Sequence, residues 1–128
     1  MRFLCIYKPV KAEGTPPTQQ EMDRMGKLIE DGMKSGTLLA TEGCLPSAKG
    51  ARIRLSEGKF VVTDGPFTES KELIAGFALI QTKSKAEAIE YTKDFLKVAG
   101  DGETEIRQIF DVADFAAEVY AAEFVKQS

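Results

Sequence analysis

The 128-residue sequence predicts a single α+β domain, a ferredoxin-like βαβ-βαβ sandwich with an inserted β-hairpin and an extra C-terminal helix. A strand–helix–strand pattern occurs twice, once on each side of a hairpin pattern. The hydrophobic fraction of 43% and the charged fraction of 29% are those of a globular chain of one domain. We expect residues 1–111 to form the common core and residues 112–128 to form a helical extension.

The first part of the chain predicts a strand, a helix and a second strand. Residues 2–8 alternate so that both faces of the strand are apolar. Thr18 and Glu21 form a capping box that starts a helix, and Gly36 ends it. Residues 37–43 predict the second strand. We expect the apolar stripe of the helix to pack in the core, with a methionine-rich binding surface as the alternative. This stripe contains Met22, Met25, Ile29 and Met33.

The second part predicts a hairpin, a strand and a helix. Residues 51–63 read as two strands that turn at residues 56–58. Residues 73–82 predict a strand with two apolar faces. The capping box Ser84–Glu87 starts the second helix, which ends at Gly100. Its inner face is predicted to carry Ala88, Ile89, Thr92, Phe95, Leu96 and Ala99.

The last part predicts a strand over residues 104–111, followed by a terminal helix that Asp111 or Asp114 caps. Two helices cover only one face of a four-stranded sheet, yet these strands are apolar on both faces. We therefore expect a second copy of the chain to cover the other face, sheet to sheet, in a homodimer. The alternative is that the terminal helix folds across this face.

Composition excludes several classes of function. The net charge is −3 and the basic residues are scattered, so we expect no nucleic-acid partner. No window is long and apolar enough to span a membrane, and the N-terminus lacks the pattern of a signal peptide, so we expect a cytoplasmic protein without a membrane partner.

The absence of histidine from the sequence narrows the chemistry further. It excludes Ser-His and Cys-His nucleophilic systems within the chain. It also argues against a transition-metal site, so we expect neither a metal nor an organic cofactor. The two cysteines are far apart in sequence and are expected to be separate thiols, with Cys5 in the core and Cys44 more exposed.

The segment "TDGPFTESKE", residues 63–72, has two interpretations. In the first it is only a turn: Asp64 and Gly65 supply turn chemistry, Pro66 begins a short helix, and Phe67 packs into the core. Asp64 is then a cap.

In the second interpretation the same turn is a binding site. The free amides of the short helix would form a socket for an anion beside the carboxylate of Asp64. Lys71 adds a cation within one turn. Hydroxyl groups come from Thr63, Thr68 and Ser70. Partial burial of Asp64 would raise its pKa toward the range of a general base.

The stretch "VTDGPFTESKE" followed by "GF" resembles the signature of the DGPF branch of the YCII-related proteins. Thr68 and Ser70 stand where the usual form has alanine and threonine. The piece "TEGCLPS", residues 41–47, resembles a second turn of this family. The resemblance covers residues 1–111. It implies a ferredoxin-like fold assembled as a dimeric α/β barrel, in a bacterial protein whose wider relatives include cofactor-independent enzymes.

The resemblance carries little chemistry across to particular residues. Relatives have been suggested to use a His-Asp pair, of which only Asp64 is present here. Members of the branch are often encoded near alternative sigma factors, which implies a regulatory setting.

Two functions follow as hypotheses. In the first, the protein is a cofactor-independent enzyme that transfers protons on a small molecule, with Asp64 as base and Glu42 as its partner. The expected ligand-binding residues are Tyr7, Gly65, Phe67, Thr68 and Lys71. In the second, the protein is a non-catalytic dimer that binds a small ligand or takes part in transcription control.

Overall fold

The computed structural model describes residues 1–67 and 73–115. Its main sheet is antiparallel and has the strand order β2-β5-β1-β6. The first strand of each βαβ unit, β1 or β5, lies at the centre, and a helix connects it to an outer strand. This is the ferredoxin-like arrangement, so the predicted fold class is confirmed. The strands are β1 (Arg2–Pro9), β2 (Leu38–Gly43), β5 (Gly76–Gln81) and β6 (Gly102–Gln108).

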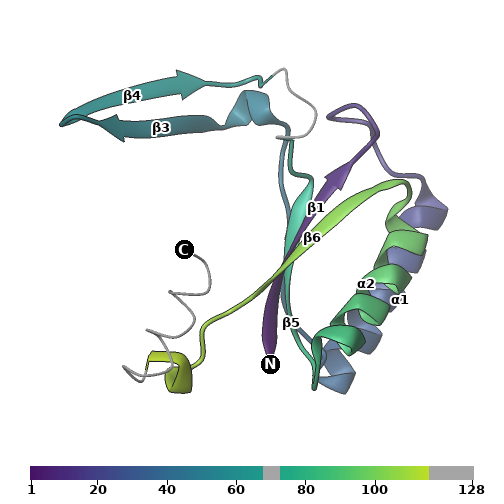
Figure 1. The fold of residues 1–128 in the computed structure, drawn as a ribbon. Helices are drawn as coiled ribbons and strands as arrows, with labels where there is room; N and C mark the ends of the chain where they lie inside the picture. The colour runs from purple at the N-terminus through teal and green to yellow at the C-terminus, as the bar shows by residue number, and fades with distance from the viewer. Residues whose placement is uncertain (68–72, 116–128) are drawn as a thin grey trace.

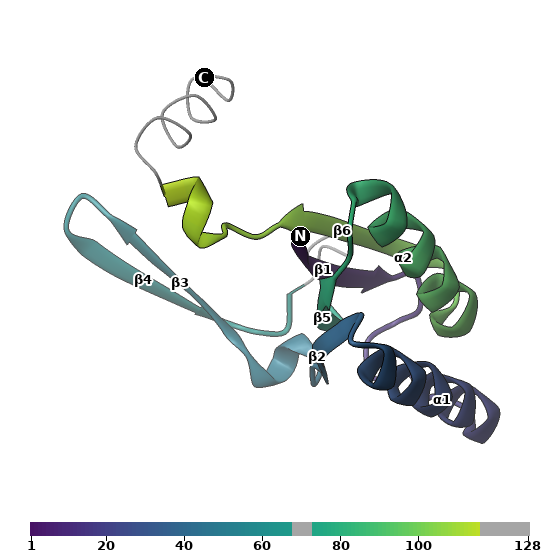
Figure 2. The ribbon, with the colours of Figure 1, turned by 90° about the horizontal axis from the view of Figure 1, so that it is seen from below.

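Two helices, α1 (Gln19–Ser35) and α2 (Lys85–Ala99), cover one face of this sheet (Figure 2). Both begin where the capping boxes predict. Thr18 Oγ1 accepts a hydrogen bond from the Glu21 amide at 3.1 Å, and Ser84 Oγ accepts one from the Glu87 amide at 3.1 Å. Gly36 ends α1 with a left-handed φ of 79°. The predicted helix boundaries are confirmed.

The buried core lies between the helices and the inner face of the sheet. Phe3 pairs with Ile80 across β1 and β5, and Cys5 pairs with Ala78 on the same face. The buried apolar residues are Phe3, Cys5, Leu38, Ile80 and Ala88.

Some residues expected in this core are exposed. Met22 and Met33 are 47% and 45% exposed. The prediction that the methionine stripe of α1 packs in the core is therefore wrong for these two residues. Ile89, assigned to the inner face of α2, is 38% exposed. The core is smaller than the apolar pattern indicates, and three of its members, Cys5, Leu38 and Ile80, also border a cavity between the helices and the sheet.

The outer face of the sheet carries Leu4 and Ile6 from β1 with Phe77 and Leu79 from β5. Phe77 is 41% exposed. In both ribbon views the two helices lie on the opposite side of the sheet, and no helix or strand of the described residues covers this face (Figures 1 and 2). The two-faced pattern predicted for these strands is confirmed.

The C-terminal part differs from the expectation. The last strand, β6, begins two residues earlier than predicted and ends at Gln108, where the Ile109 amide turns to the Arg2 carbonyl at 2.8 Å. The chain then forms a short 3₁₀ helix, η3 (Val112–Phe115). Most of the predicted terminal helix, residues 116–128, lies outside the described residues. Within the described part, no helix has the length and apolar character needed to cross a membrane.

The inserted hairpin forms as predicted from β3 (Ala51–Ser56) and β4 (Lys59–Asp64). Its two-residue turn has positive φ at Glu57, 51°, and at Gly58, 78°, which matches the twist of paired strands. Every residue of both strands is exposed. The hairpin runs away from the main sheet on the side opposite the helices (Figure 1).

Candidate functional site

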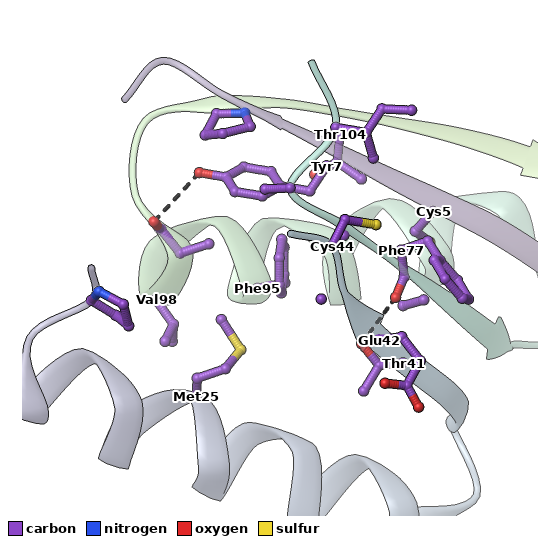
Figure 3. Close-up of a pocket in the computed structure, with 18 of the residues that line it drawn as sticks. Cys5, Tyr7, Met25, Thr41, Glu42, Cys44, Phe77, Phe95, Val98 and Thr104 are labelled. Carbon is purple, nitrogen blue, oxygen red and sulfur yellow. Dashed lines mark hydrogen bonds between the residues drawn. The ribbon is translucent and has the colours of Figure 1, made fainter. Parts of the chain in front are cut away.

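A cavity of about 990 Å³ lies between the inner face of the sheet and the two helices (Figure 3). Its volume is in the range of ligand sites in proteins. Tyr7 from β1, Met25 from α1 and Phe95 from α2 form apolar walls. Three loop segments also line it: residues 11–17, residues 44–46 and residues 73–75.

The cavity exists because small residues face it where large ones would be needed to fill it. Gly26 on α1 has no side chain and nothing within 4 Å of the place where a Cβ would stand. Ala78 and Ala99 line the cavity from β5 and from the end of α2. Farther along β1 in the same layer, Phe3 does not line the cavity and fills the space between sheet and helices.

Tyr7 forms part of the wall and holds the end of α2. Its hydroxyl donates to the carbonyl of Gly100 at 3.0 Å, and its ring meets Phe95 edge to face with the centroids 5.2 Å apart. Burial raises the pKa of Tyr7, and nearby Asp101 adds to this while Lys11 opposes it. The phenol therefore stays neutral at ordinary pH.

Thr104 lies beside Tyr7, its partner in the β1–β6 register, and also lines the cavity. Its hydroxyl oxygen is buried without a hydrogen-bond partner. A buried hydroxyl without a partner is unfavourable, and rotation about the Cα–Cβ bond would turn it toward the cavity.

An ion pair stands at the edge of the cavity. Lys11 Nζ lies 3.1 Å from Glu21 Oε2, and both residues line the cavity. The hydrogen bond from Lys11 lowers the pKa of the Glu21 carboxyl, with a smaller contribution from Thr18. Glu21 was predicted only as a helix cap, and Lys11 belongs to a loop without a recognised motif.

Glu42 follows the prediction in part. It lies near the end of β2, is exposed and is among the residues around the cavity. It pairs with Phe77 of β5, so its side chain belongs to the outer face of the sheet, at the β2 edge beside the cavity. Its carboxylate makes no hydrogen bond or ion pair with the described residues.

Both cysteines line the same cavity as free thiols, as expected from their separation in sequence. Cys5 is buried, and burial raises the pKa of its thiol, against a hydrogen bond with Thr92 that lowers it. Cys44 is exposed. Among the described residues, no three Cys, Asp or Glu side chains gather in a way that could hold a metal ion.

Asp64 lies elsewhere. It ends β4, pairs with Ala51, is exposed and does not line the cavity. The expected partial burial is therefore wrong for this chain, because Asp64 stands at the base of the hairpin, opposite Ala51, where none of the described residues covers it. The structure does not bring Asp64 and Glu42 together in one cavity. Thr68 and Lys71 lie outside the described residues.

The turn that follows Asp64 is fastened to the loop between β2 and β3. The Gly65 amide donates to the Gly50 carbonyl at 3.0 Å, and a Cβ on Gly65 would overlap the carbonyl of Ser47. The prediction that the Phe67 ring packs into the core is wrong. It stacks beneath the guanidinium of Arg52, 3.8 Å from the ring centroid. Neither Gly65 nor Phe67 lines the cavity.

Ser47 connects this turn to the cavity. Its hydroxyl accepts from the Phe67 amide at 2.9 Å and donates to Glu13 Oε2 at 2.7 Å. Its own amide donates to Glu13 Oε1 at 2.7 Å. Glu13 lines the cavity, as do Leu45 and Pro46 just before Ser47. The two sequence motifs thus meet at Ser47, and sequence reasoning had assigned no role to Ser47 or Glu13.

Comparison with known proteins identifies a family and two similar proteins. The model of the YCII-related domain matches residues 1–113. An uncharacterised protein, R00369, of Rhizobium meliloti (strain 1021) is 37% identical over 62 residues, 48% of this chain and 50% of that protein, so the match spans half of the relative's length. A solved structure of 5-chloro-2-hydroxyhydroquinone dehydrochlorinase (TftG) from Burkholderia phenoliruptrix AC1100, in complex with 2,5-dihydroxybenzoquinone, has a TM-score of 0.48 and 14% identity. It covers 88% of this chain and 97% of its own.

Proposed function

The chain belongs to the YCII-related family, and we propose that it binds a small, mainly apolar molecule in the cavity between the helices and the sheet. The observation that carries this proposal is the cavity itself, about 990 Å³ between the sheet and the helices, in a layer where Phe3 and Ala88 are fully buried beyond it. An apolar space of this size with a few polar groups is the usual form of a small-molecule site.

The walls indicate the kind of molecule. Met25, Phe95 and the ring of Tyr7 offer apolar contacts, which favour a ring or a hydrocarbon body. The hydroxyl of Thr104 offers a hydrogen bond to a hydroxyl or carbonyl group. Lys11 and Glu21 already neutralise each other at the edge, so the site does not require a charged ligand.

Calorimetric titration with 2-naphthol tests this proposal. Met25→Trp places a large side chain in the cavity, and Met33→Trp changes an exposed methionine of the same helix that does not line it. We expect the first variant to lose at least about tenfold in affinity and the second to bind as the wild type does. Equal binding by all three proteins would place the ligand elsewhere and contradict the proposal.

A second candidate function is proton transfer on the bound molecule. Glu42 supports it, because its unpaired carboxylate stands at the β2 edge of the sheet beside the cavity, where it can take a proton from a carbon next to a carbonyl group of a molecule that reaches this edge. Asp64 was the base predicted from the sequence. Its catalytic role stays a prediction, and it would require a ligand position outside this cavity.

Deuterium exchange of 2-tetralone in D₂O, followed by NMR, tests proton transfer. An enzyme of this kind would accelerate exchange of the protons next to the carbonyl group. Glu42→Gln should remove the acceleration, whereas Glu57→Gln at the tip of the hairpin should leave it unchanged. Binding without acceleration would favour the non-catalytic alternative, in which a small-ligand sensor acts in regulation.

The assembly belongs to the same proposal. We propose a homodimer in which the outer face of each sheet, with Leu4, Ile6, Phe77 and Leu79, faces the second copy. The support is the apolar character of a face that the two helices leave open. A cytoplasmic location remains a prediction from the sequence.

A further inference from the structure

The hairpin has one apolar face and one basic face. The register pairs Ile53 with Val62 and Leu55 with Phe60, and alternation places all four on one face. Their exposed fractions are 71%, 61%, 61% and 71% in that order. The opposite face carries Arg52, Arg54, Lys59, Val61 and Thr63.

None of the described residues packs against this apolar face, since every residue of β3 and β4 is exposed. A two-stranded hairpin is at best marginally stable in water, and four large apolar side chains in a row are a poor surface for solvent. The base is nevertheless held in place by Gly65, Phe67 and Arg52. The structure therefore presents a fixed arm whose apolar face is left open by residues 1–67 and 73–115.

A second copy of this chain is the occupant that fits. The hairpin runs from the sheet on the side of its open outer face (Figure 1). Two apolar surfaces thus lie on the same side of one molecule. A two-fold axis in front of the outer face brings each hairpin to the second copy, and one symmetric contact then covers both surfaces of both chains.

We propose that residues 51–64 form a dimerisation arm, which lies with Ile53, Leu55, Phe60 and Val62 against the second copy. This inference rests on the homodimer proposed above, to which it adds the element that holds the two copies together. The basic face of the arm remains toward solvent.

The arm also links the assembly to the DGPF turn. Asp64 continues the row of Phe60 and Val62 at the base of the apolar face, opposite Ala51. The second copy therefore covers the region next to Asp64, which is open to solvent in the single chain. In this arrangement the surroundings of Asp64 are complete only in the dimer.

Two neighbouring valines give a matched test. Val62 lies on the apolar face and Val61 on the basic face, and they are 61% and 55% exposed. Sedimentation equilibrium of wild type, Val62→Glu and Val61→Glu compares the two faces with the same substitution. We expect Val62→Glu to raise the dimer dissociation constant at least about tenfold and Val61→Glu to leave it within about twofold.

Other results would contradict the proposal that residues 51–64 form a dimerisation arm. If both variants dimerise as the wild type does, the arm is not at the interface, while the sheet-to-sheet homodimer stands. If both weaken dimerisation equally, the contact does not use the apolar face. A wild type that remains monomeric at high concentration would overturn both the arm and the homodimer, without bearing on ligand binding in the cavity.

A measurement on the unaltered protein covers the case in which Val62→Glu does not fold. Hydrogen exchange of residues 51–64 is compared at low and high protein concentration. Protection of the hairpin amides that rises at least about tenfold with concentration supports the arm. Protection that does not change with concentration while the dimer population rises overturns it.

Discussion

The hydroxyl oxygen of Ser47 accepts a hydrogen bond from the amide of Phe67 at 2.9 Å, and so joins the DGPF turn to the loop between β2 and β3. The same hydroxyl donates to the carboxylate of Glu13, on the loop between β1 and α1. Three loops that are distant in sequence therefore share one side chain. Two of these loops line the cavity, which gives the turn a positioning role at the site.

Ser47→Ala should loosen this junction. The Phe67 amide and the Glu13 carboxylate each lose a partner, and we expect the free energy of unfolding to fall by about 1 kcal/mol. We also expect weaker binding of 2-naphthol, because Leu45 and Pro46 lose their anchor. Chemical denaturation and calorimetry measure the two effects. Ser47→Thr keeps the hydroxyl and should restore both the stability and the affinity. If Ser47→Ala changes neither quantity, the hydrogen bonds of Ser47 do not position the loops of the cavity.

Gly65→Ala should be more damaging. A Cβ at this position would overlap the backbone carbonyl of Ser47, which cannot move without displacing the loop. We expect a loss of about 2–4 kcal/mol in thermal or chemical unfolding. Gly26→Ala is the control, because its Cβ would meet nothing within 4 Å in the middle of α1, and it should stabilise the protein by about 0.5–1 kcal/mol. A harmless Gly65→Ala would contradict the close packing of the turn.

The two thiols should differ in reactivity. Cys44 is exposed, whereas Cys5 is buried and burial raises the pKa of its thiol. Titration of the native protein with Ellman's reagent should show one fast thiol per chain and a second only on unfolding. Cys44→Ser should remove the fast phase. Two fast thiols in the native wild type would mean that the inner layer is open to the reagent.

Ionisation of Tyr7 should destabilise the fold at alkaline pH. Burial raises its pKa above the ordinary value of 10.0, so the folded state favours the neutral phenol. This contribution is fully present below the pKa of the unfolded chain and is lost as the pH rises through the higher folded value. Denaturation at several pH values should show a steeper alkaline loss in wild type than in Tyr7→Phe. If the stability of the two proteins falls in parallel as the pH rises, Tyr7 makes no such contribution.

The ion pair at the cavity edge should be visible in the acid range. Lys11 lowers the pKa of the Glu21 carboxyl, so the pair is complete above the ordinary glutamate pKa and is lost as the pH falls through the lower folded value. In Lys11→Met we expect the NMR titration midpoint of Glu21 to move up toward that of a free glutamate. Lys27→Met, on the exposed side of α1, should leave it in place.

The sequence by itself determined the order of strands and helices, the capping boxes at Thr18 and Ser84, the hairpin turn at Gly58 and the membership of a family. These features depend on alternation, helical spacing and contacts within a few residues, which are local in the chain. The strand pattern also indicated two apolar faces correctly. The ends of β6 were predicted two to three residues too late, because pairing with β1, and not the local sequence, decides where the strand begins and ends.

Only the tertiary structure decided which residues share a site. Asp64 belongs to the most distinctive motif, yet it lies exposed at the base of the hairpin and does not line the cavity. Ser47 and Glu13 meet across 34 residues of sequence, a contact that no local pattern records. The methionines of α1 could not be placed from spacing, because helical periodicity identifies a face but not whether core atoms or a cavity lie opposite it.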